Sequence, residues 1–462
     1  MRISDCFEKM DVTGSINNED LIEAVENEED VDYSEERELV EDSCSTKVLD
    51  TCEEPRDRYC IVYILFYLFG ISSLVPWNFL ITANDYWMYK FRDVVPNNLT
   101  MYVRKTQFQA EFTSYLNVAT AIPNLIFLIL NSLYGHWVSM RSRLQGALII
   151  VTLSLLVTTS FVQVDTDQWQ NTFFIITMVT VVIMTAASAV FIGCLVGIAS
   201  KFSKEYMAAV VSGQSLGGII AAIAQIISLA FKISPLHSAL IYFCIADIMV
   251  VLSLISYVML YRIDFFTYHI LRGSGGMATN RHREASMLGI LRKIWVYAFS
   301  IFAVFGISMA VYPAVTVLVE SHPITAGTDW NNIFFVPVVN YLIFNCGDYS
   351  GRLVAGFLLR PNNQWVIAGA SILRIIGVPM LMLCNAQPRK HLPVVFLWDY
   401  EYILIMIVFA FTNGYLTNIV MINSTRVVEM HEREKASSVV ATMLSVGLTV
   451  GAAVGMLLVR LL

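Results

Sequence analysis

The sequence predicts an all-α polytopic membrane protein, because its composition and the spacing of its apolar runs agree. Apolar residues make up 56% of the 462 residues and charged residues only 15%, a balance typical of a membrane protein and not of a soluble domain. A membrane-spanning helix needs about 20 mostly apolar residues. Eleven such runs are expected as transmembrane helices in a six-plus-five arrangement, over residues 60–85, 111–134, 144–164, 171–199, 206–231, 237–261, 294–319, 333–358, 365–384, 400–422 and 437–460.

Residues 1–57 are expected to form an acidic, disordered cytosolic tail. Acidic residues crowd the stretch between Glu19 and Asp42, and such a segment buries too little apolar surface to order itself. The net charge of −7 therefore describes the tail more than the rest of the chain. The tail lacks the basic start and apolar centre of a signal peptide, so the first span is expected to direct insertion.

Two groups of helices are expected, over 58–261 and 294–462, joined by a cytosolic linker over 262–293. The linker is expected to be flexible because it contains Gly273-Ser274-Gly275-Gly276 among mixed polar residues. Lysine and arginine mark cytosolic loops. They occur in the loops after the second, fourth, sixth and tenth spans: Arg141, Arg143, Lys201, Lys204, Arg262, Arg272, Arg281, Arg283, Arg292, Lys293, Arg426, Arg433 and Lys435.

This pattern predicts a cytosolic N-terminus and, with an odd number of spans, an extracellular C-terminus. The first external loop departs from the pattern, because it holds four bases: Lys90, Arg92, Arg104 and Lys105. The same loop contains the sequon Asn98-Leu99-Thr100, which predicts glycosylation of Asn98. We expect the plasma membrane, with the lysosomal membrane as the alternative, because Glu35–Val40 loosely resembles an acidic dileucine sorting signal but ends in valine.

The chain lacks the nucleotide-binding and metal-binding motifs of common enzymes. Neither G-x-x-x-x-G-K-[ST] nor H-E-x-x-H is present, and no two of the eight cysteines form C-x-x-C. We therefore expect no ATP-driven pumping, no enzymatic activity, no metal and no cofactor.

The strongest candidate site is the polar run from Phe344 to Arg352 within the eighth span. An ionised side chain at membrane depth costs at least about 2.5–3.5 kcal/mol on insertion scales, so it persists only when it faces the interior and is paired. Asp348 and Arg352 are four residues apart on one helical face, which suits an ion pair, and Asn345 lies on the same face. Either this stripe lines a pathway, with Asp348 accepting hydrogen bonds from a hydroxylated solute, or the pair only locks helices together.

Other polar residues lie in expected spans. Pro76, Trp77 and Asn78 occur in the first span, where a proline and an amide are tolerated when protein or a cavity covers the freed backbone groups. The embedded Asp247 and Arg374 are interpreted as structural partners within the bundle, and Asp247 alternatively as a proton-sensitive group.

A glycine-rich run lies in the fifth span. There, Gly213 and Gly218 are expected to allow close helix packing, and Gln214 is a candidate for a polar contact.

From about Arg56 to its end, the chain resembles the equilibrative nucleoside transporter family. Five motifs, in order, carry the resemblance: PWNFLITA at 76–83, SGQSLGG at 212–218, YPAVTV at 312–317, FNCGDYSGR at 344–352 and TNGYL at 412–416. The resemblance implies a fold similar to the major facilitator fold, with a central cavity that opens alternately to each side. It implies nucleosides, both purine and pyrimidine and also nucleobases, as the solutes, membrane lipids as the surroundings and no nucleic acid as a partner.

The resemblance also implies roles for individual residues. Leu74 and Trp77 would contact the nucleobase, with Ile81 one turn further along. Asp348 would bind the ribose hydroxyls and Arg352 would hold that carboxylate. Ile192 lies where members of the family often carry a glutamine. The rest of the lining would be Gln214, Tyr312, Tyr341, Asn345 and Leu448.

Facilitated, sodium-independent nucleoside transport is the leading prediction. A proton-linked nucleoside or organic-cation transporter of the same fold is the first alternative, because Asp247 is embedded and Ile192 replaces an amide. A sugar porter of the major facilitator type is less favoured, since such porters have a further span and a loop motif that 134–143 lacks. A receptor or scaffold is the last alternative, and the embedded acid–base pair argues against it.

Overall fold

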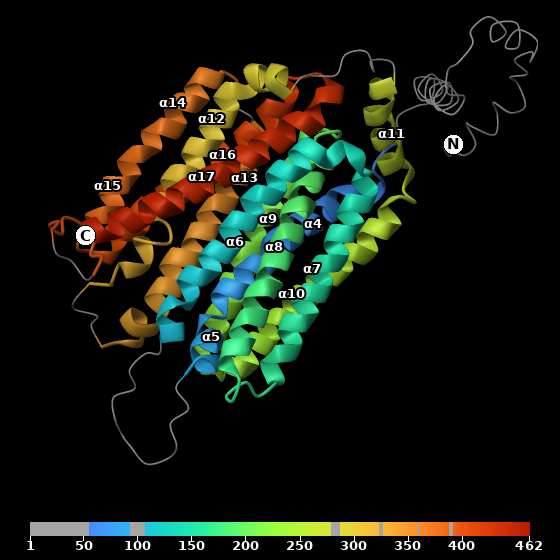
Figure 1. The fold of residues 1–462 in the computed structure, drawn as a ribbon. Coiled ribbons are helices and arrows are strands. Elements are labelled where there is room, and N and C mark those ends of the chain that lie inside the picture. Colours follow the sequence, from blue (N-terminus) through green and yellow to red (C-terminus); the bar gives the residue numbers. More distant parts are fainter. Residues whose placement is uncertain (1–54, 93–106, 279–286, 323–326, 359–360, 388–390) are drawn as a thin grey trace, which may run out of the picture.

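The computed structural model describes residues 55–92, 107–278, 287–322, 327–358, 361–387 and 391–462 (Figure 1). Within these ranges the chain is predominantly helical, which confirms the predicted all-α class. Nine of the described helices are long and apolar enough to cross a membrane, so the chain is a multi-pass membrane protein. The expected total of eleven spans stays a prediction. The expected tail up to residue 54 and Asn98 lie outside the described residues.

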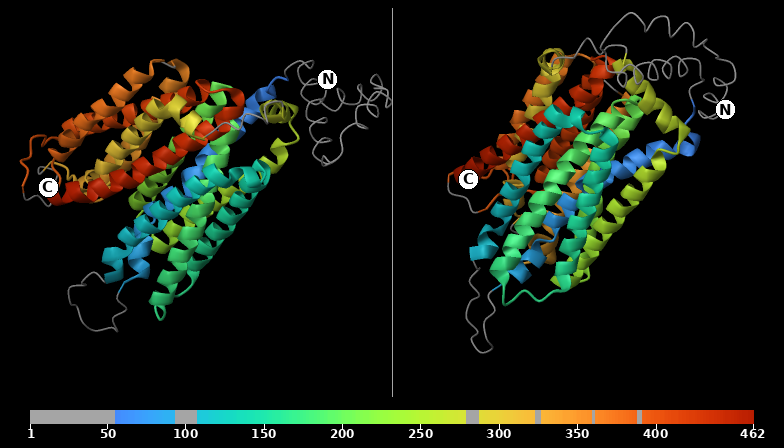
Figure 2. Two further views of the ribbon diagram at one scale, coloured as in Figure 1. Left: turned by 45° about the horizontal axis from the view of Figure 1, so that its top comes forward. Right: turned by 45° about the vertical axis from the view of Figure 1, so that its right-hand side comes forward.

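The long helices fall into two groups, as the views in Figures 1 and 2 show. The first group comprises α4 (Ile61–Thr82), α6 (Gln107–Tyr134), α7 (Met140–Gln163), α8 (Gln170–Ala199), α9 (Lys204–Ala230) and α10 (Pro235–Leu260), with the short α5 (Asn84–Lys90) after α4. The second group comprises α12 (Met287–Val311), α13 (Phe344–Leu358), α14 (Gln364–Leu373), α15 (Gly377–Met382), α16 (Asp399–Arg426) and α17 (Arg433–Leu461).

The stretch between the two groups differs from the flexible linker expected over 262–293. It contains an additional helix, α11 (Asp264–Ala278), and α12 begins at Met287. The glycine-rich run Gly273–Gly276 lies in the last turns of α11. Helix propensity is a weak prior that tertiary contacts override. Helix α11 packs through Phe266, which is fully buried and contacts the rings of Phe66 and Phe202.

Short polar side chains mark the starts of several helices. The Asp57 carboxylate accepts hydrogen bonds from the backbone N–H groups of Val62 and Tyr63 at 3.1 Å each, and so satisfies donors that the first turn of α4 leaves free. Ser139 caps α7 in the same way, and Ser234 caps α10, with Pro235 at its first position.

The interior and the outer surface are both apolar. Large aromatic residues such as Phe66, Phe79 and Trp87 are fully buried between the helices of the first group. Large aliphatic residues on the outside remain more than half exposed, among them Ile64, Leu153, Ile175, Ile248, Leu404 and Leu457. An apolar exterior around a packed interior is the arrangement that a lipid bilayer requires, because lipid tails solvate these side chains.

Glycines bring α4 and α9 into backbone contact. A Cβ atom on Gly213 would lie 2.4 Å from the Tyr67 carbonyl oxygen, and one on Gly70 would lie 2.3 Å from the Val210 carbonyl oxygen. The packing role predicted for Gly213 is therefore confirmed. Gly218 lies against the side chain of Asn345 instead, so it packs the first group of helices against the second.

The two groups meet along α6 with α17 and along α9 with α13. Asn124 on α6 donates to the Ser445 hydroxyl on α17 at 2.8 Å. Tyr67 on α4 donates to the Tyr349 hydroxyl on α13 at 2.9 Å. These polar contacts lie beside a hydrophobic core to which both groups contribute, with Phe66 and Val210 from the first group and Ile301 and Val440 from the second.

Gly213→Ala is expected to destabilise the purified protein by about 1–3 kcal/mol, because overpacking at a backbone contact forces the two helices apart. Thermal unfolding in detergent measures the effect. Gly369→Ala on α14 is the matched control, since no atom lies within 4 Å of the added methyl group there. Equal unfolding temperatures for the two variants would contradict the packing role.

Candidate functional site

The span that carries the predicted polar run is partly a π-helix. Residues Trp330–Phe334 and Val336–Ile343 have π geometry, and α13 continues from Phe344. The fully buried Asn340 holds this wide segment in place: its amide donates to the Thr316 carbonyl at 2.8 Å, and it accepts a hydrogen bond from the Tyr402 hydroxyl on α16. π-helical turns are rare and often occur at functional sites.

Asp348 is the centre of a buried polar network. Its carboxylate is 4% exposed, and its Oδ2 lies 2.8 Å from Nε of Arg352, which is 5% exposed. The Ser215 hydroxyl on α9 donates to Oδ2, and the Asn413 amide on α16 donates to Oδ1 at 2.7 Å. The expected ion pair is therefore present, and the carboxylate binds three helices together.

Arg352 extends the network to α9. Its Nη1 donates to the Val211 carbonyl at 2.5 Å and lies 3.4 Å from Oε1 of Gln214. The Asn418 amide on α16 donates to the Arg352 carbonyl at 2.6 Å. Since α9 belongs to the first group of helices and α13 to the second, the ion pair crosses between the groups.

Arg374, in the turn that links α14 to α15, joins the same network. It is 6% exposed, and Nη1 donates to the Phe409 carbonyl at 2.9 Å and to the Thr412 hydroxyl. Nη2 lies 2.7 Å from the Ser308 hydroxyl and 3.3 Å from Oδ1 of Asn413. The Asn413 amide thus points its nitrogen at the acid and its oxygen at Arg374, which is the orientation that both charges favour.

The backbones of α13 and α16 touch beside this network. A Cβ atom on Gly414 would lie 1.8 Å from the Asp348 carbonyl oxygen, and one on Gly351 would lie 2.1 Å from the Phe411 carbonyl oxygen. Only glycine allows helices to approach this closely. The close contact places the Asn413 amide within reach of Asp348.

Several other predicted residues lie on or beside α13. Asn345 donates to the Tyr341 carbonyl at 2.8 Å where the π-helix meets α13. Tyr312 stacks on Phe344 with ring centroids 3.9 Å apart and 10° between the ring planes. Of these predicted residues and Gln214, only Gln214 makes a direct polar contact with the ion pair, through Arg352.

The remaining predicted residues lie on other helices. Leu74, Trp77 and Ile81 are half-buried along α4, Ile192 on α8 and Leu448 on α17. Trp77 and Ile192 pack against the hydrophobic core that both groups of helices share. The polar contacts described for Asp348 and Arg352 do not include these five residues, and their contact with a solute stays a prediction.

Sequence reasoning missed several members of the network. Ser215, Ser308 and Asn413 are buried and polar, yet no role was predicted for them. A buried amide or hydroxyl also needs a partner, so the cost of burying a polar group, which singled out Asp348, applies equally to Asn413.

The run Gly213–Gly217 spells the letters G-x-S-x-G. In hydrolases that motif forms a strand-to-helix turn, whereas Ser215 lies inside α9 and donates to Asp348.

Asp247 lies apart from this network. It is 8% exposed on α10, and its Oδ2 accepts a hydrogen bond from the Thr159 hydroxyl on α7 at 2.7 Å. Among the described residues its Oδ1 has no hydrogen-bond partner. The contact joins two helices of the first group.

Basic residues of several loops meet at one end of the bundle, called the basic end here. Glu434 on α17 lies 3.6 Å from Arg143 on α7 and 3.3 Å from Lys201 after α8. These contacts confirm that the two basic loops share one side, and they tie the first group of helices to the second. Two bases lie toward the opposite end of the bundle. Arg92 lies 2.7 Å from Asp167. Burial lowers the pKa of Lys90.

A family model described as nucleoside transporter matches residues 178–287 and 275–460. Equilibrative nucleoside transporter 1 of Homo sapiens is 31% identical to this chain over 451 residues, which cover 87% of this chain and 98% of that protein. This chain belongs to the nucleoside transporter family. Equilibrative nucleoside transporter 2 of Homo sapiens is 30% identical over 459 residues, covering 89% of this chain and 99% of that protein. As predicted, the family is one of transporters and not of enzymes.

The fold is similar to that of major facilitator transporters. The proton:xylose symporter XylE matches with a TM-score of 0.56 and 12% identity, over 86% of this chain and 87% of that chain. At this identity the likeness concerns the fold alone. It agrees with the major facilitator fold that the sequence resemblance implied.

Arg374→Lys is expected to destabilise the protein by about 3 kcal/mol, because lysine keeps the charge but lacks the planar fork that contacts Ser308 and Thr412 together. Arg460→Lys, at an exposed position near the end of α17, is the control. Thermal unfolding of both purified variants gives the comparison, and an unchanged midpoint for Arg374→Lys would show that the network does not depend on the guanidinium.

Proposed function

We propose that this chain carries nucleosides across a membrane by facilitated, sodium-independent, alternating-access transport. The observation that carries the proposal is the family membership, with relatives named as equilibrative nucleoside transporters that match over nearly their whole length. Purine and pyrimidine nucleosides are the proposed solutes, and nucleobases are further candidates. These solutes are neutral, so downhill flux needs neither a nucleotide motor nor a compensating ion.

The Asp348 network supports a role in binding the sugar. An ionised carboxylate offers about four lone-pair sites, and Arg352, Ser215 and Asn413 occupy three of them. A ribose hydroxyl that donates to Asp348 takes the free site or replaces the Ser215 hydroxyl. We propose that Trp77 and Leu74 contact the base from α4, that Ile81 and Ile192 border it, and that Tyr312, Tyr341, Asn345, Gln214 and Leu448 complete the lining.

The contacts at the basic end support alternating access. Glu434 joins the two groups of helices there through Arg143 and Lys201, so the path is closed at that end. Opening it requires these partly buried ion pairs to separate while the groups rock against each other. A quarter of the Glu434 side chain is exposed, so water can solvate the carboxylate as the contacts separate.

For the orientation, we propose that the basic end faces the cytosol. The N-terminus would then be cytosolic, the C-terminus extracellular and Asn98 glycosylated. The plasma membrane is proposed over the lysosomal membrane. Residues 58–261 and 294–462 would be the two moving groups, with 262–293 on the cytosolic side between them.

The function is tested by uptake of radiolabelled uridine and adenosine into transporter-deficient cells and into proteoliposomes, with and without sodium and at acidic and neutral pH. Labelled nucleoside should reach equal concentrations on both sides and leave preloaded vesicles as readily as it enters empty ones. Accumulation above equilibrium under a proton gradient would favour the proton-linked alternative. Xylose uptake without nucleoside uptake would favour a sugar porter.

Asp348→Asn is expected to lower nucleoside uptake about tenfold or more with surface protein retained, because the neutral amide leaves Arg352 without its counter-charge. Asp247→Asn is the matched control, since it makes the same chemical change on a buried acid outside the network. Uptake per surface molecule is the measurement. Similar losses in both variants would remove the special role of Asp348, and a loss confined to Asp247→Asn would support proton coupling.

Trp77→Ala is expected to weaken inhibition of uridine uptake by adenosine more than Trp77→Phe does, since phenylalanine still offers an aromatic face to a base. Competition curves for the two variants at equal surface expression give the comparison. If both substitutions weaken adenosine equally, Trp77 serves packing or an indole hydrogen bond and not stacking.

A further inference from the structure

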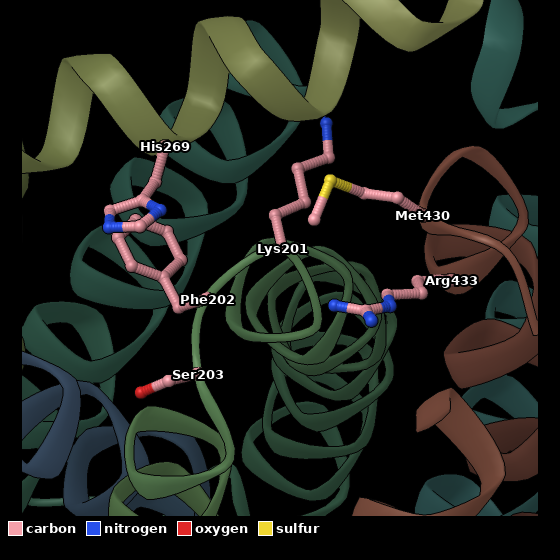
Figure 3. A pocket seen from close by; sticks show the side chains of 6 residues that line it. All are labelled: Lys201, Phe202, Ser203, His269, Met430 and Arg433. Atoms are coloured by element: carbon pink, nitrogen blue, oxygen red, sulfur yellow. The ribbon is translucent and has the colours of Figure 1, made fainter. Parts of the chain in front are cut away.

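A separate pocket lies at the basic end, away from the Asp348 network (Figure 3). Its volume is about 200 Å³, and six side chains line it: Lys201, Phe202, Ser203, His269, Met430 and Arg433. Three of the six carry a basic nitrogen and none is an acid. Residues from the α8–α9 connection, from α11 and from the start of α17 contribute to it, so the pocket lies between the two groups of helices.

The six residues that line the pocket carry an excess of positive charge. Lys201 lies 3.3 Å from Glu434, but that single carboxylate also lies 3.6 Å from Arg143. Arg433 adds a further positive charge, and its buried Nε has no hydrogen-bond partner among the described residues. In Figure 3 the Arg433 guanidinium points into the space below Lys201, and the Lys201 side chain extends away from it toward α11. Arg433 and Lys201 both line the pocket, so their positive charges favour an anion there.

Several groups around the pocket suit a phosphate group. Arginine and lysine form short, charge-assisted hydrogen bonds with phosphate oxygens. Two long helices begin beside the pocket, α9 after Ser203 and α17 at Arg433, and helix starts add positive potential. The volume of about 200 Å³ is below the roughly 300–1,000 Å³ of sites that enclose whole drug-sized ligands, so the pocket suits a phosphate group and little more.

We propose that this pocket is a regulatory site for a phosphate monoester group, presented either by a membrane lipid headgroup or by a small soluble phosphate ester. Because its walls come from both groups of helices, a bound phosphate stabilises the arrangement that is closed at the basic end. Any ligand that prefers one state shifts the equilibrium toward it, so occupancy slows the transport cycle. The site goes beyond the proposed transport function and does not depend on the identity of the solute.

Binding is tested by thermal unfolding of the full-length protein. Two probes are compared at constant ionic strength: inorganic phosphate added to the protein in detergent, and phosphatidylcholine bilayers with or without phosphatidylinositol 4-phosphate. We expect a saturable rise in the unfolding temperature. In Arg433→Gln the apparent affinity is expected to fall roughly tenfold. Arg426→Gln is the matched control, because it removes the same charge from an exposed position outside the pocket lining.

The two probes distinguish the sources. A response to inorganic phosphate supports a soluble ester, and a response to the phosphoinositide alone supports a lipid headgroup. Absence of a saturable rise with both probes overturns the proposal, as does an equal loss in Arg433→Gln and Arg426→Gln. If Arg433→Gln does not fold, Arg433→Lys serves instead, since it keeps the charge and loses the forked donor, and it should bind more weakly than the unmodified protein.

Discussion

One buried carboxylate constrains how this bundle is assembled. Asp348 lies among apolar helices, where an unpaired charge is costly, and it is stabilised only because Arg352, Ser215 and Asn413 reach it from three helices. Those contacts require α9, α13 and α16 to meet at one point. Glycines at 351 and 414 permit the backbone approach that the meeting demands. The contact with Arg374 is a consequence of this arrangement. Asn413 directs its side-chain oxygen away from Asp348, and that oxygen accepts a hydrogen bond from Arg374.

The two polar connections between the groups of helices differ in physical character. The Asp348 network is buried, and the contacts of the carboxylate itself are short, so breaking them exposes charges to a low dielectric at high cost. The contacts of Glu434 at the basic end are longer and reach solvent more readily, with a quarter of the Glu434 side chain exposed. In the proposed cycle, opening of the basic end separates Glu434 from its bases and leaves the buried network intact.

The features predicted from sequence are those with local causes. Hydropathy measures the transfer of a segment into lipid, so the apolar spans and the multi-pass class were predictable, and the Asp348–Arg352 pair was predictable because it lies four residues apart on one helix. The link from Asn413 to Arg374 joins residues 39 positions apart, and no periodicity indicates it. Helix α11 was missed because its glycine-rich sequence favours a flexible segment, whereas Phe266 packs it against the core. The π-helical winding before Phe344 also depends on a distant contact, between Asn340 and Tyr402.

The network also bears on why a carrier of this type needs no coupling ion. An equilibrative carrier must reorient when empty as well as when loaded. A binding carboxylate left bare in the empty state would hold the carrier in place or recruit a cation, which would couple solute flux to an ion gradient. In the mechanism proposed above, Asp348 is paired with Arg352 and accepts hydrogen bonds from Ser215 and Asn413, so the protein itself compensates its charge. A sugar hydroxyl that replaced the Ser215 hydroxyl would leave the charge of the site unchanged. A carrier whose binding carboxylate is compensated in this way would cross between its states at little electrostatic cost.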